Sequence, residues 1–307
     1  MLTIWRFMDG NRAHEKQSAA LVSGVRSCLG AGAVDCRDLS CSEFAVPLWG
    51  ELPEQLHQLP KPDLIVGVGH RSHWAVLRAR RVFGGRSVII LKPSLPLTWF
   101  DFVIVPEHDC PPPLPNVILT RGALTEPLPE EPFEPGRALL LFGGPSKHFH
   151  WDTAKVSSAA DQLLRLPLRW VVSDSRRTPE QMLAHCADSG AELWPWRECP
   201  SGWLADQMAR AGQIWVTGDS ISMIFEALQS RARVGVITLP SRRPRNKIRG
   251  AVQRLLDDGL VREWRGGEMT PFPAVPRAPF SQQVSCARAL LRRCGWSLAQ
   301  LPEDIDI

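Results

Sequence analysis

The sequence predicts an α/β protein with two parallel-sheet domains, and three observations carry this prediction. The chain has 307 residues, which is two domains' worth at roughly 150 residues per domain. In both halves, short apolar runs that suit buried parallel strands alternate with segments of helical periodicity. A proline-dense stretch from Pro106 to Pro135 separates the halves and is expected to be a linker, because proline fixes φ and removes a hydrogen-bond donor.

The expected elements alternate along the chain. In the first half we expect a helix and five strands, at His14–Leu29 and at Thr3–Met8, Asp63–Val68, Ser87–Leu91, Phe102–Val105 and Val117–Leu119. In the second half we expect a helix and four strands, at Thr153–Arg165 and at Ala138–Phe142, Arg169–Val172, Gln213–Val216 and Val234–Leu239. Such βαβ units predict two Rossmann-like domains, facing one another across a cleft. Ligands bind these sheets at the carboxyl ends of the strands, so the loops that follow the strands should hold the chemistry.

The domain boundaries follow from the linkers. The N-terminal domain is expected to span residues 1–130, and the C-terminal domain residues 136–270. A second proline-rich stretch, Pro271–Pro276, follows the C-terminal domain, and Phe280–Cys294 then has helical periodicity. A helix beyond the second linker predicts that residues 280–307 return to the first domain.

Composition excludes several classes of protein. With 44% hydrophobic and 22% charged residues, the chain is neither disordered nor a coiled coil. A net charge of +4 is too small to indicate nucleic-acid binding. The eight cysteines form no CxxC pair, which indicates reduced thiols in a cytosolic protein. We find no signal-peptide pattern and no apolar window near the ~20 residues of a membrane span, so a soluble protein is expected, and contact with a membrane surface stays open.

The most informative segment runs from Trp215 to Ala227. A strand is expected to end at Val216, followed by a glycine turn and a helix that Asp219 or Ser220 caps. The predicted buried face of this helix comprises Ile221, Ile224, Phe225 and Leu228, and a polar face comprises Asp219, Ser222, Met223 and Glu226. Backbone N–H groups and the Ser220 hydroxyl could bind phosphate oxygens, and Glu226 could accept two hydrogen bonds from a ribose diol. A capped helix with one exposed carboxylate is the alternative.

Two further loops carry groups suited to a diphosphate. After the first strand of the second half come four candidate binding residues, Gly143, Gly144, Ser146 and Lys147. The glycines let the backbone approach something closely, although the segment is neither a dinucleotide fingerprint nor an NTPase P-loop. Arg176 and Arg177 follow the next strand and suit a diphosphate, with an ordinary solvated charge pair as the alternative.

The first strand of the chain leads to two residues suited to proton transfer. Asp9 and His14 are the only such groups on its loop, and His14 is a candidate general base because imidazole titrates near neutrality. The alternative is a histidine without a role at a helix N-terminus. His70 and His73 follow another strand and could line the same cleft.

No metal site is predicted. His148 and His150 alternate as HxH, but no third ligand has suitable spacing, so a solvated loop is the expected structure.

Six motifs, taken in order along nearly the whole chain, resemble one family. They are Asp9-Gly10, Pro106–Asp109, Thr120–Leu124, Gly143–His148, Ser175–Pro179 and Thr217–Met223. The set resembles the mitochondrial-fission "elongated mitochondria" family, which occurs in plants and widely in bacteria. The Arg-rich and Trp-rich composition indicates a bacterial member, for which a role in mitochondrial division is not expected.

The resemblance implies a GT-B glycosyltransferase-like fold that binds a nucleotide-sugar mainly through its second domain. It implies that Glu226 contacts the ribose and that a set of loop residues surrounds the diphosphate, namely Gly143, Gly144, Ser220, Ser222 and Met223. The first-domain loop would face the acceptor. Ala13 precedes His14 here, where a glycine is common in such enzymes.

Two main classes of function remain open from the sequence. The first is a metal-independent glycosyltransferase that moves a sugar from a nucleotide-sugar to a cell-envelope or lipid-linked acceptor, because helix dipoles and cations can stabilise the leaving diphosphate. The second is a non-catalytic adaptor with the same fold. A nucleotide-sugar epimerase or hydrolase is a third and weaker alternative. No cofactor beyond the donor is expected, and the expected location is the cytoplasm, with the inner face of the membrane left open.

Overall fold

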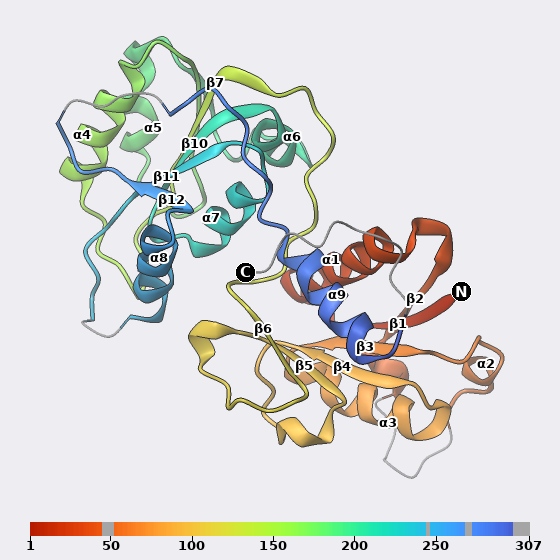
Figure 1. Cartoon of the computed structure of the whole chain (residues 1–307). Coiled ribbons are helices and arrows are strands. Elements are labelled where there is room, and N and C mark those ends of the chain that lie inside the picture. The colour runs from red at the N-terminus through yellow and green to blue at the C-terminus, as the bar shows by residue number, and fades with distance from the viewer. Residues whose placement is uncertain (45–51, 244–245, 268–271, 297–307) are drawn as a thin grey trace. The chain divides into compact units, whose positions relative to one another are not determined.

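The computed structural model describes residues 1–44, 52–243, 246–267 and 272–296 (Figure 1). The chain forms two compact units. The N-terminal domain comprises Met1–Pro127 and Ser281–Ile307, and the C-terminal domain comprises Leu128–Phe280. Pro271 of the second proline-rich stretch and residues 297–307 of the predicted returning segment lie outside the described residues.

The N-terminal domain is a six-stranded parallel sheet with helices on both faces (Figure 1). Its strand order is β2-β1-β3-β4-β5-β6. The strands are β1 Leu2–Met8, β2 Val34–Ser40, β3 Leu64–Val68, β4 Arg86–Ile90, β5 Phe102–Pro106 and β6 Val117–Thr120. One hydrophobic core lies under α1 (Arg12–Leu29) and α9 (Gln282–Arg293). A second core, on the opposite face, lies under α3 (His73–Phe83) and the short α2 (Glu54–His57).

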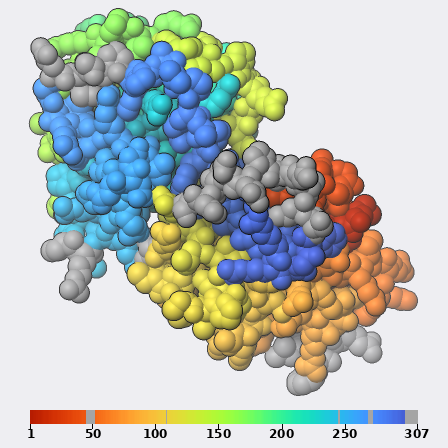
Figure 2. All heavy atoms as spheres, in the orientation of Figure 1, coloured from red at the N-terminus to blue at the C-terminus, as the bar shows by residue number. Residues whose placement is uncertain are grey.

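The C-terminal helix α9 packs on the N-terminal domain, as the sequence predicted. Its buried residues Ala287, Leu290 and Leu291 join the core beneath α1, and Figure 2 shows its blue atoms among the orange and yellow atoms of that domain. A Cβ at Gly24 of α1 would lie 2.2 Å from the carbonyl oxygen of Gln283 in α9. The two helices can approach this closely because that position carries no side chain.

The C-terminal domain is a second six-stranded parallel sheet, in the order β12-β11-β10-β7-β8-β9. The strands are β7 Glu134–Leu141, β8 Arg169–Ser173, β9 Glu192–Trp194, β10 Ala211–Thr217, β11 Arg233–Ile237 and β12 Val261–Glu263. The helices are α4 Thr153–Leu164, α5 Gln181–His185, α6 Trp203–Arg210, α7 Ile221–Leu228 and α8 Lys247–Asp257. Residues of α4 and α5 pack in one core, and residues of α6, α7 and α8 pack in the core on the other face of the sheet. The predicted fold class, two Rossmann-like α/β domains, is therefore confirmed.

The proline-dense stretch between the domains differs from the expected plain linker. β6 within it matches the strand expected at Val117–Leu119, but the bounding prolines lie in strands, since Pro106 ends β5 and Pro135 is the second residue of β7. Proline is tolerated at the ends of strands, where a missing N–H interrupts little of the hydrogen-bond ladder. No helix in the described part of the chain is long and apolar enough to cross a membrane.

Candidate functional site

Each sheet has a point where the strand order reverses. In the C-terminal domain this switch point lies between β7 and β10, whose following helices α4 and α7 pack on opposite faces of the sheet. In the N-terminal domain it lies between β1 and β3, followed by α1 and α3. Ligands of open α/β sheets bind in the crevice at the carboxyl ends of such strands. Most residues predicted from the sequence lie at these two places, and Arg176 and Arg177 lie on the loop after β8.

A loop that begins with Gly143 and Gly144 follows β7. The amide of Gly143 donates a 2.7 Å hydrogen bond to Thr217 Oγ1, and the amide of Gly144 donates a 3.0 Å bond to Asp219 Oδ2. A Cβ on Gly143 would lie 2.4 Å from both carboxylate oxygens of Asp219, and a Cβ on Gly144 would lie 2.0 Å from the carbonyl oxygen of Arg177. The close approach predicted from these glycines exists, but it is to the protein itself.

Asp219 and Arg177 form an ion pair that holds the glycine loop. The Asp219 side chain is fully buried, and its Oδ2 lies 2.8 Å from Nη2 of Arg177, whose own side chain is 42% exposed. Arg177 Nη1 also donates to the carbonyl oxygen of Gly144 at 2.7 Å. Arg177 was predicted to contact a diphosphate and Asp219 to belong to the nucleotide-sugar site, whereas here the two side chains bind each other and the glycine loop. The expected capping by Asp219 is wrong, because its carboxylate is used by Arg177 and Gly144.

Helix α7 has the predicted buried face, since Ile224, Phe225 and Leu228 are buried and Ile221 is half-buried. Ser220 is its N-cap residue, yet its side chain makes no capping hydrogen bond, so the predicted hydroxyl cap is wrong. The polar face is as expected in outline: Ser222 is exposed, and Met223 and Glu226 are half-buried. The first turn therefore offers backbone N–H groups with the partial positive charge of a helix N-terminus.

The other predicted binding residues lie on the neighbouring loops. Ser146 Oγ accepts from the amides of His148 and Phe149, both at 3.2 Å, so it shapes its own turn. Lys147 and Arg176 are exposed. Arg177 is therefore bonded to the Gly143–Gly144 loop and to Asp219, whereas the Arg176 side chain is exposed to solvent.

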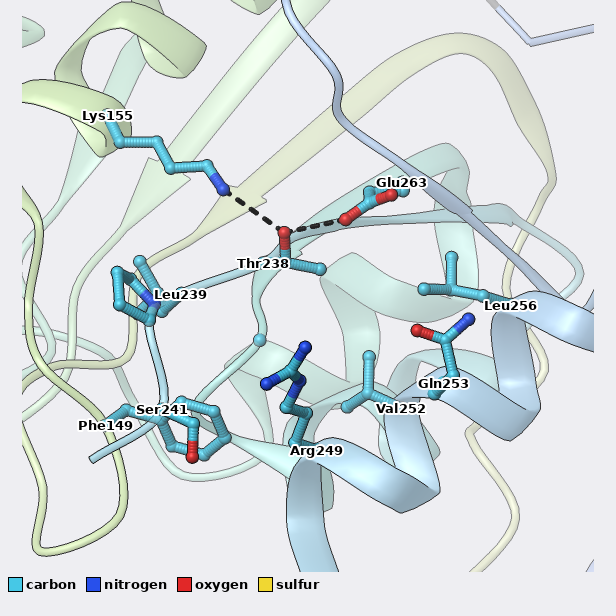
Figure 3. Close-up of a pocket in the computed structure, with 12 residues that line it drawn as sticks. Phe149, Lys155, Thr238, Leu239, Ser241, Arg249, Val252, Gln253, Leu256 and Glu263 are labelled. Atoms are coloured by element: carbon cyan, nitrogen blue, oxygen red, sulfur yellow. Dashed lines mark hydrogen bonds between the residues drawn. The ribbon is translucent and has the colours of Figure 1, made fainter. Parts of the chain in front are cut away.

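A cavity of about 260 Å³ lies beside Gly218, at the carboxyl ends of β10, β11 and β12 (Figure 3). Lys155 of α4 donates to Thr238 Oγ1 at 3.2 Å, and the Thr238 hydroxyl donates to Glu263 Oε1 at 2.8 Å. Figure 3 shows Lys155 and Glu263 pointing to the threonine from opposite sides, with the Arg249 guanidinium of α8 reaching into the same space. Cations, a carboxylate and a hydroxyl converge here over an apolar wall.

The sequence reasoning missed this cavity. The expected strand Val234–Leu239 ends at Ile237 instead, so Thr238 lies in the loop at the carboxyl end of β11. The rule that loops after strands hold the chemistry would have pointed to Thr238, but the contacts with Lys155 and Glu263 join segments 83 and 25 residues away. No local pattern contains them.

At the switch point of the N-terminal domain, Asp9 and His14 form a close pair. His14 Nδ1 lies 2.7 Å from Asp9 Oδ2, the His14 side chain is 20% exposed and that of Asp9 is 2% exposed. The other oxygen, Oδ1, accepts from the amide of Asn11 at 3.0 Å. A carboxylate at Nδ1 keeps the proton on that nitrogen and leaves the lone pair on Nε2, which is the arrangement of a general base.

The surroundings of this pair distinguish it from the other groups on the same edge. A Cβ on Gly69, which follows β3, would lie 2.5 Å from His14 Cε1, so the loop after β3 packs directly on the imidazole. Burial raises the pKa of the Cys41 thiol to about 11, and the charge of Asp9 adds to this rise, so the thiol stays protonated. His70 is exposed, but His73 is 1% exposed and packs against Phe100 with the two rings tilted, so the prediction that it lines a cleft is wrong. Burial, with a smaller effect of His70, lowers the pKa of His73.

One family pattern spans nearly the whole chain, and it covers His14 and the residues of the second-domain site but not Asp9. A family profile described as mitochondrial fission ELM1 matches residues 13–294. The chain belongs to the mitochondrial fission ELM1 family. The family named from the sequence motifs is therefore confirmed. No curated protein sequence matches this ELM1 family member.

Solved structures resemble this ELM1 family member across both domains. A Listeria monocytogenes protein provisionally named UDP-N-acetylglucosamine 2-epimerase has a TM-score of 0.55 at 11% identity, with 100% of each chain covered. Acinetobacter baumannii MurG has a TM-score of 0.47 at 13% identity, with 96% of this chain and 99% of MurG covered. Medicago truncatula UGT71G1, solved with UDP-glucose, has a TM-score of 0.43 at 11% identity, with 94% and 89% covered. The likeness to the Listeria protein shows the fold alone, and it agrees with the two Rossmann-like domains that the sequence predicted.

Proposed function

We propose that the protein is a glycosyltransferase that moves a sugar from a nucleotide-sugar donor to a cell-envelope or lipid-linked acceptor, without a metal ion. The observation that carries this proposal is the His14–Asp9 pair, because an adaptor has no need of an oriented imidazole at the switch point of its first sheet. The class of acceptor, lipid-linked or part of the cell envelope, is inferred from the sequence resemblance. The solved structures support the fold, and the name of one of them includes UDP-glucose.

The reaction would use His14 Nε2 to accept the proton of an acceptor hydroxyl. The freed oxygen attacks the anomeric carbon of the donor, the bond from that carbon to the diphosphate breaks, and the nucleoside diphosphate leaves with the electron pair. Asp9 holds the imidazole in the required tautomer and stabilises the imidazolium that forms. The N-terminus of α7, with exposed Arg176 and Lys147 on neighbouring loops, would stabilise the negative charge of the leaving diphosphate.

The cavity beside Gly218 would hold the transferred sugar. Gly218 directly precedes the loop that leads into α7, so a diphosphate at the helix N-terminus would present its sugar to this cavity. The lining alternates hydrogen-bond donors, on Lys155 and Arg249, with the acceptor carboxylate of Glu263. Sugar hydroxyls both donate and accept, and they match such a lining better than an apolar ligand would.

Replacing Lys155 or Arg249 with methionine is expected to weaken binding of a nucleotide-sugar about tenfold or more, because each hydrogen bond to a charged group contributes roughly 1.5–3 kcal/mol. Binding of the nucleoside diphosphate without its sugar should stay the same. Calorimetric titration with both ligands measures the difference. Arg254→Met is the matched control, since Arg254 is exposed on the same helix and does not line the cavity. Equal losses for the two ligands would place the sugar elsewhere.

Glu226→Gln is expected to reduce nucleotide affinity by roughly 1.5–3 kcal/mol, the size of a hydrogen bond to a charged group, with the fold intact. The substitution keeps the shape and helix propensity of the side chain but removes its charge. A 2′-deoxy nucleotide should bind the wild type more weakly and lose little further in the variant, because both changes remove one contact. Titration of the four combinations tests this, and additive losses would return Glu226 to a helix carboxylate without a ligand.

The function itself is tested on the full-length chain in two steps. Uridine and cytidine diphosphates and their sugars should raise the melting temperature, because a ligand that binds only the native state stabilises it. Nucleoside diphosphate release should then depend on adding a lipid-linked acceptor. No thermal shift with any nucleotide at millimolar concentration would support the adaptor instead, and conversion of the donor to an isomer without acceptor would support an epimerase.

A further inference from the structure

Two tryptophans of the N-terminal domain lie together at the surface. Trp74, in the first turn of α3, is 50% exposed, and Trp99, at the end of the 3-10 helix η4 (Leu97–Trp99), is 45% exposed. Their ring centroids are 6.3 Å apart. Val82, near the end of α3, is 47% exposed. Helix α3, which carries Trp74 and Val82, lies on the face of the sheet opposite α1 and α9 (Figure 1).

The outward position of these side chains is set by the helix. The face of α3 that meets the sheet is made of Ala75, Val76 and Ala79, which are at most 3% exposed. Trp74 and Arg81 differ by seven positions and therefore share the opposite face, and Val82 flanks it. Because a tryptophan offers more apolar area than these core residues, leaving two of them in water is costly unless another surface covers them.

The segment that carries this surface is more basic than the rest of the N-terminal domain. Residues 71–99 contain six basic residues and no acidic one, whereas the rest of residues 1–135 contains seven basic and fifteen acidic residues. Arg71 and Arg81 are exposed, three positions before and seven positions after Trp74, and Lys92 is exposed on the chain that leads from β4 to η4. Arg80 is bound to Asp101, 2.8 Å away, so that arginine is used within the domain.

We propose that the surface of Trp74, Trp99, Val82, Arg71 and Arg81 binds an anionic membrane surface. Tryptophan rings suit the boundary between head groups and acyl chains, because they are apolar yet carry an N–H that can remain hydrated. Arginines next to them attract anionic lipids, and the lack of acidic residues over this segment removes repulsion. A second copy of the chain would bring the same positive charges together, so it is the less favoured occupant. The inference is independent of which reaction the protein performs.

The test is co-sedimentation of the full-length chain with vesicles. Binding is expected with phosphatidylcholine vesicles that contain phosphatidylglycerol and not with phosphatidylcholine alone, and it should weaken as salt is added. The double variant Trp74→Ser, Trp99→Ser should bind about tenfold more weakly, since the aromatic side chains supply the apolar contact. Arg71→Glu with Arg81→Glu should lower binding at least as much, at about fivefold for each lost charge or more.

The matched control is Trp196→Ser, because Trp196 is an exposed tryptophan of the C-terminal domain with Arg197 beside its ring. This variant should bind vesicles like the wild type. Vesicles with brominated acyl chains should quench wild-type fluorescence more than that of the double variant, which shows contact rather than altered folding. Circular dichroism melts check that each variant is folded.

Three results would overturn the proposal. One is equal binding to neutral and anionic vesicles, and another is vesicle binding that the tryptophan pair does not affect. The third is a wild-type dimer in sedimentation velocity that the tryptophan variants convert to monomer, with no vesicle binding by either, which would make the surface an interface between copies.

Discussion

Replacing His14 with alanine is expected to lower turnover about a thousandfold while leaving donor affinity unchanged, because general base catalysis typically contributes 10²–10⁴-fold. The histidine lies in the first turn of α1 and is partly exposed, so its loss should not unfold the domain. The measurement is the initial rate of nucleoside diphosphate release with acceptor present, together with calorimetric titration of the donor.

Asp9→Asn is the sharper variant of the same experiment. Asp9 Oδ1 accepts from the amide of Asn11, so the oxygen of an asparagine must stay there and its NH₂ must face His14 Nδ1. That nitrogen then has to accept, which moves the imidazole proton to Nε2 and removes the base. We expect a loss of about 10²–10⁴-fold in turnover with the fold retained.

The chain offers a matched control for both variants. His185 and Asp161 of the C-terminal domain form a second pair at 2.8 Å, with side chains 38% and 48% exposed. His185→Ala should leave turnover unchanged. If His14→Ala retained full activity, or if both histidine variants lost it equally, His14 would not be the base.

Arg177→Ala is expected to destabilise the C-terminal domain by about 2–3 kcal/mol, because breaking a buried ion pair leaves an uncompensated charge and typically costs 3–5 kcal/mol. The lower figure reflects the 42% exposure of the Arg177 side chain, which lets water reach the site. Urea unfolding of the full chain, followed by circular dichroism, measures the shift. Adding Asp219→Asn should recover part of the loss, since the two residues are coupled.

The substitution Arg176→Ala, at the adjacent position, distinguishes a contribution to stability from a contribution to ligand binding. Its exposed side chain should contribute less than about 0.5 kcal/mol to stability, as is usual at the surface. It should nevertheless weaken nucleoside diphosphate binding by roughly 1.5–3 kcal/mol, with little effect on the nucleoside. Equal destabilisation by the two alanine variants would contradict the structural distinction between these adjacent arginines.

Several elements could be predicted because their information is local. The strand Thr3–Met8 differs from β1 by one residue, and the helix Thr153–Arg165 differs from α4 by one. Their signal is an uninterrupted apolar run or a 3.6-residue period. The prediction did not include β2, α3 or α8, whose sequences interleave charged residues with the apolar ones. In these elements burial is decided by what packs against them.

In the candidate site, too, some features could be predicted from local sequence and others could not. Asp9 and His14 belong to one short loop and one helical turn, so their residue types already indicated two groups suited to proton transfer, and the structure shows that they contact each other. Arg176 and Arg177 looked equivalent in sequence, and only the fold shows that Arg177 meets Asp219, 42 positions along the chain, while Arg176 faces solvent. Charge-pair partners of this kind are brought together by sheet topology.

The sequence by itself determined the family, the two-domain α/β fold and the loops that could hold chemistry. Hydrophobic periodicity and turn residues depend only on positions that are close together in the chain. Only the tertiary structure decided what those loops touch. It turned the Gly143–Gly144 loop toward Asp219 and Arg177 rather than outward, and it gathered Lys155, Thr238 and Glu263 around one cavity. The physical reason is that a parallel sheet brings the carboxyl ends of distant strands to one edge, where contacts depend on strand order and not on separation along the chain.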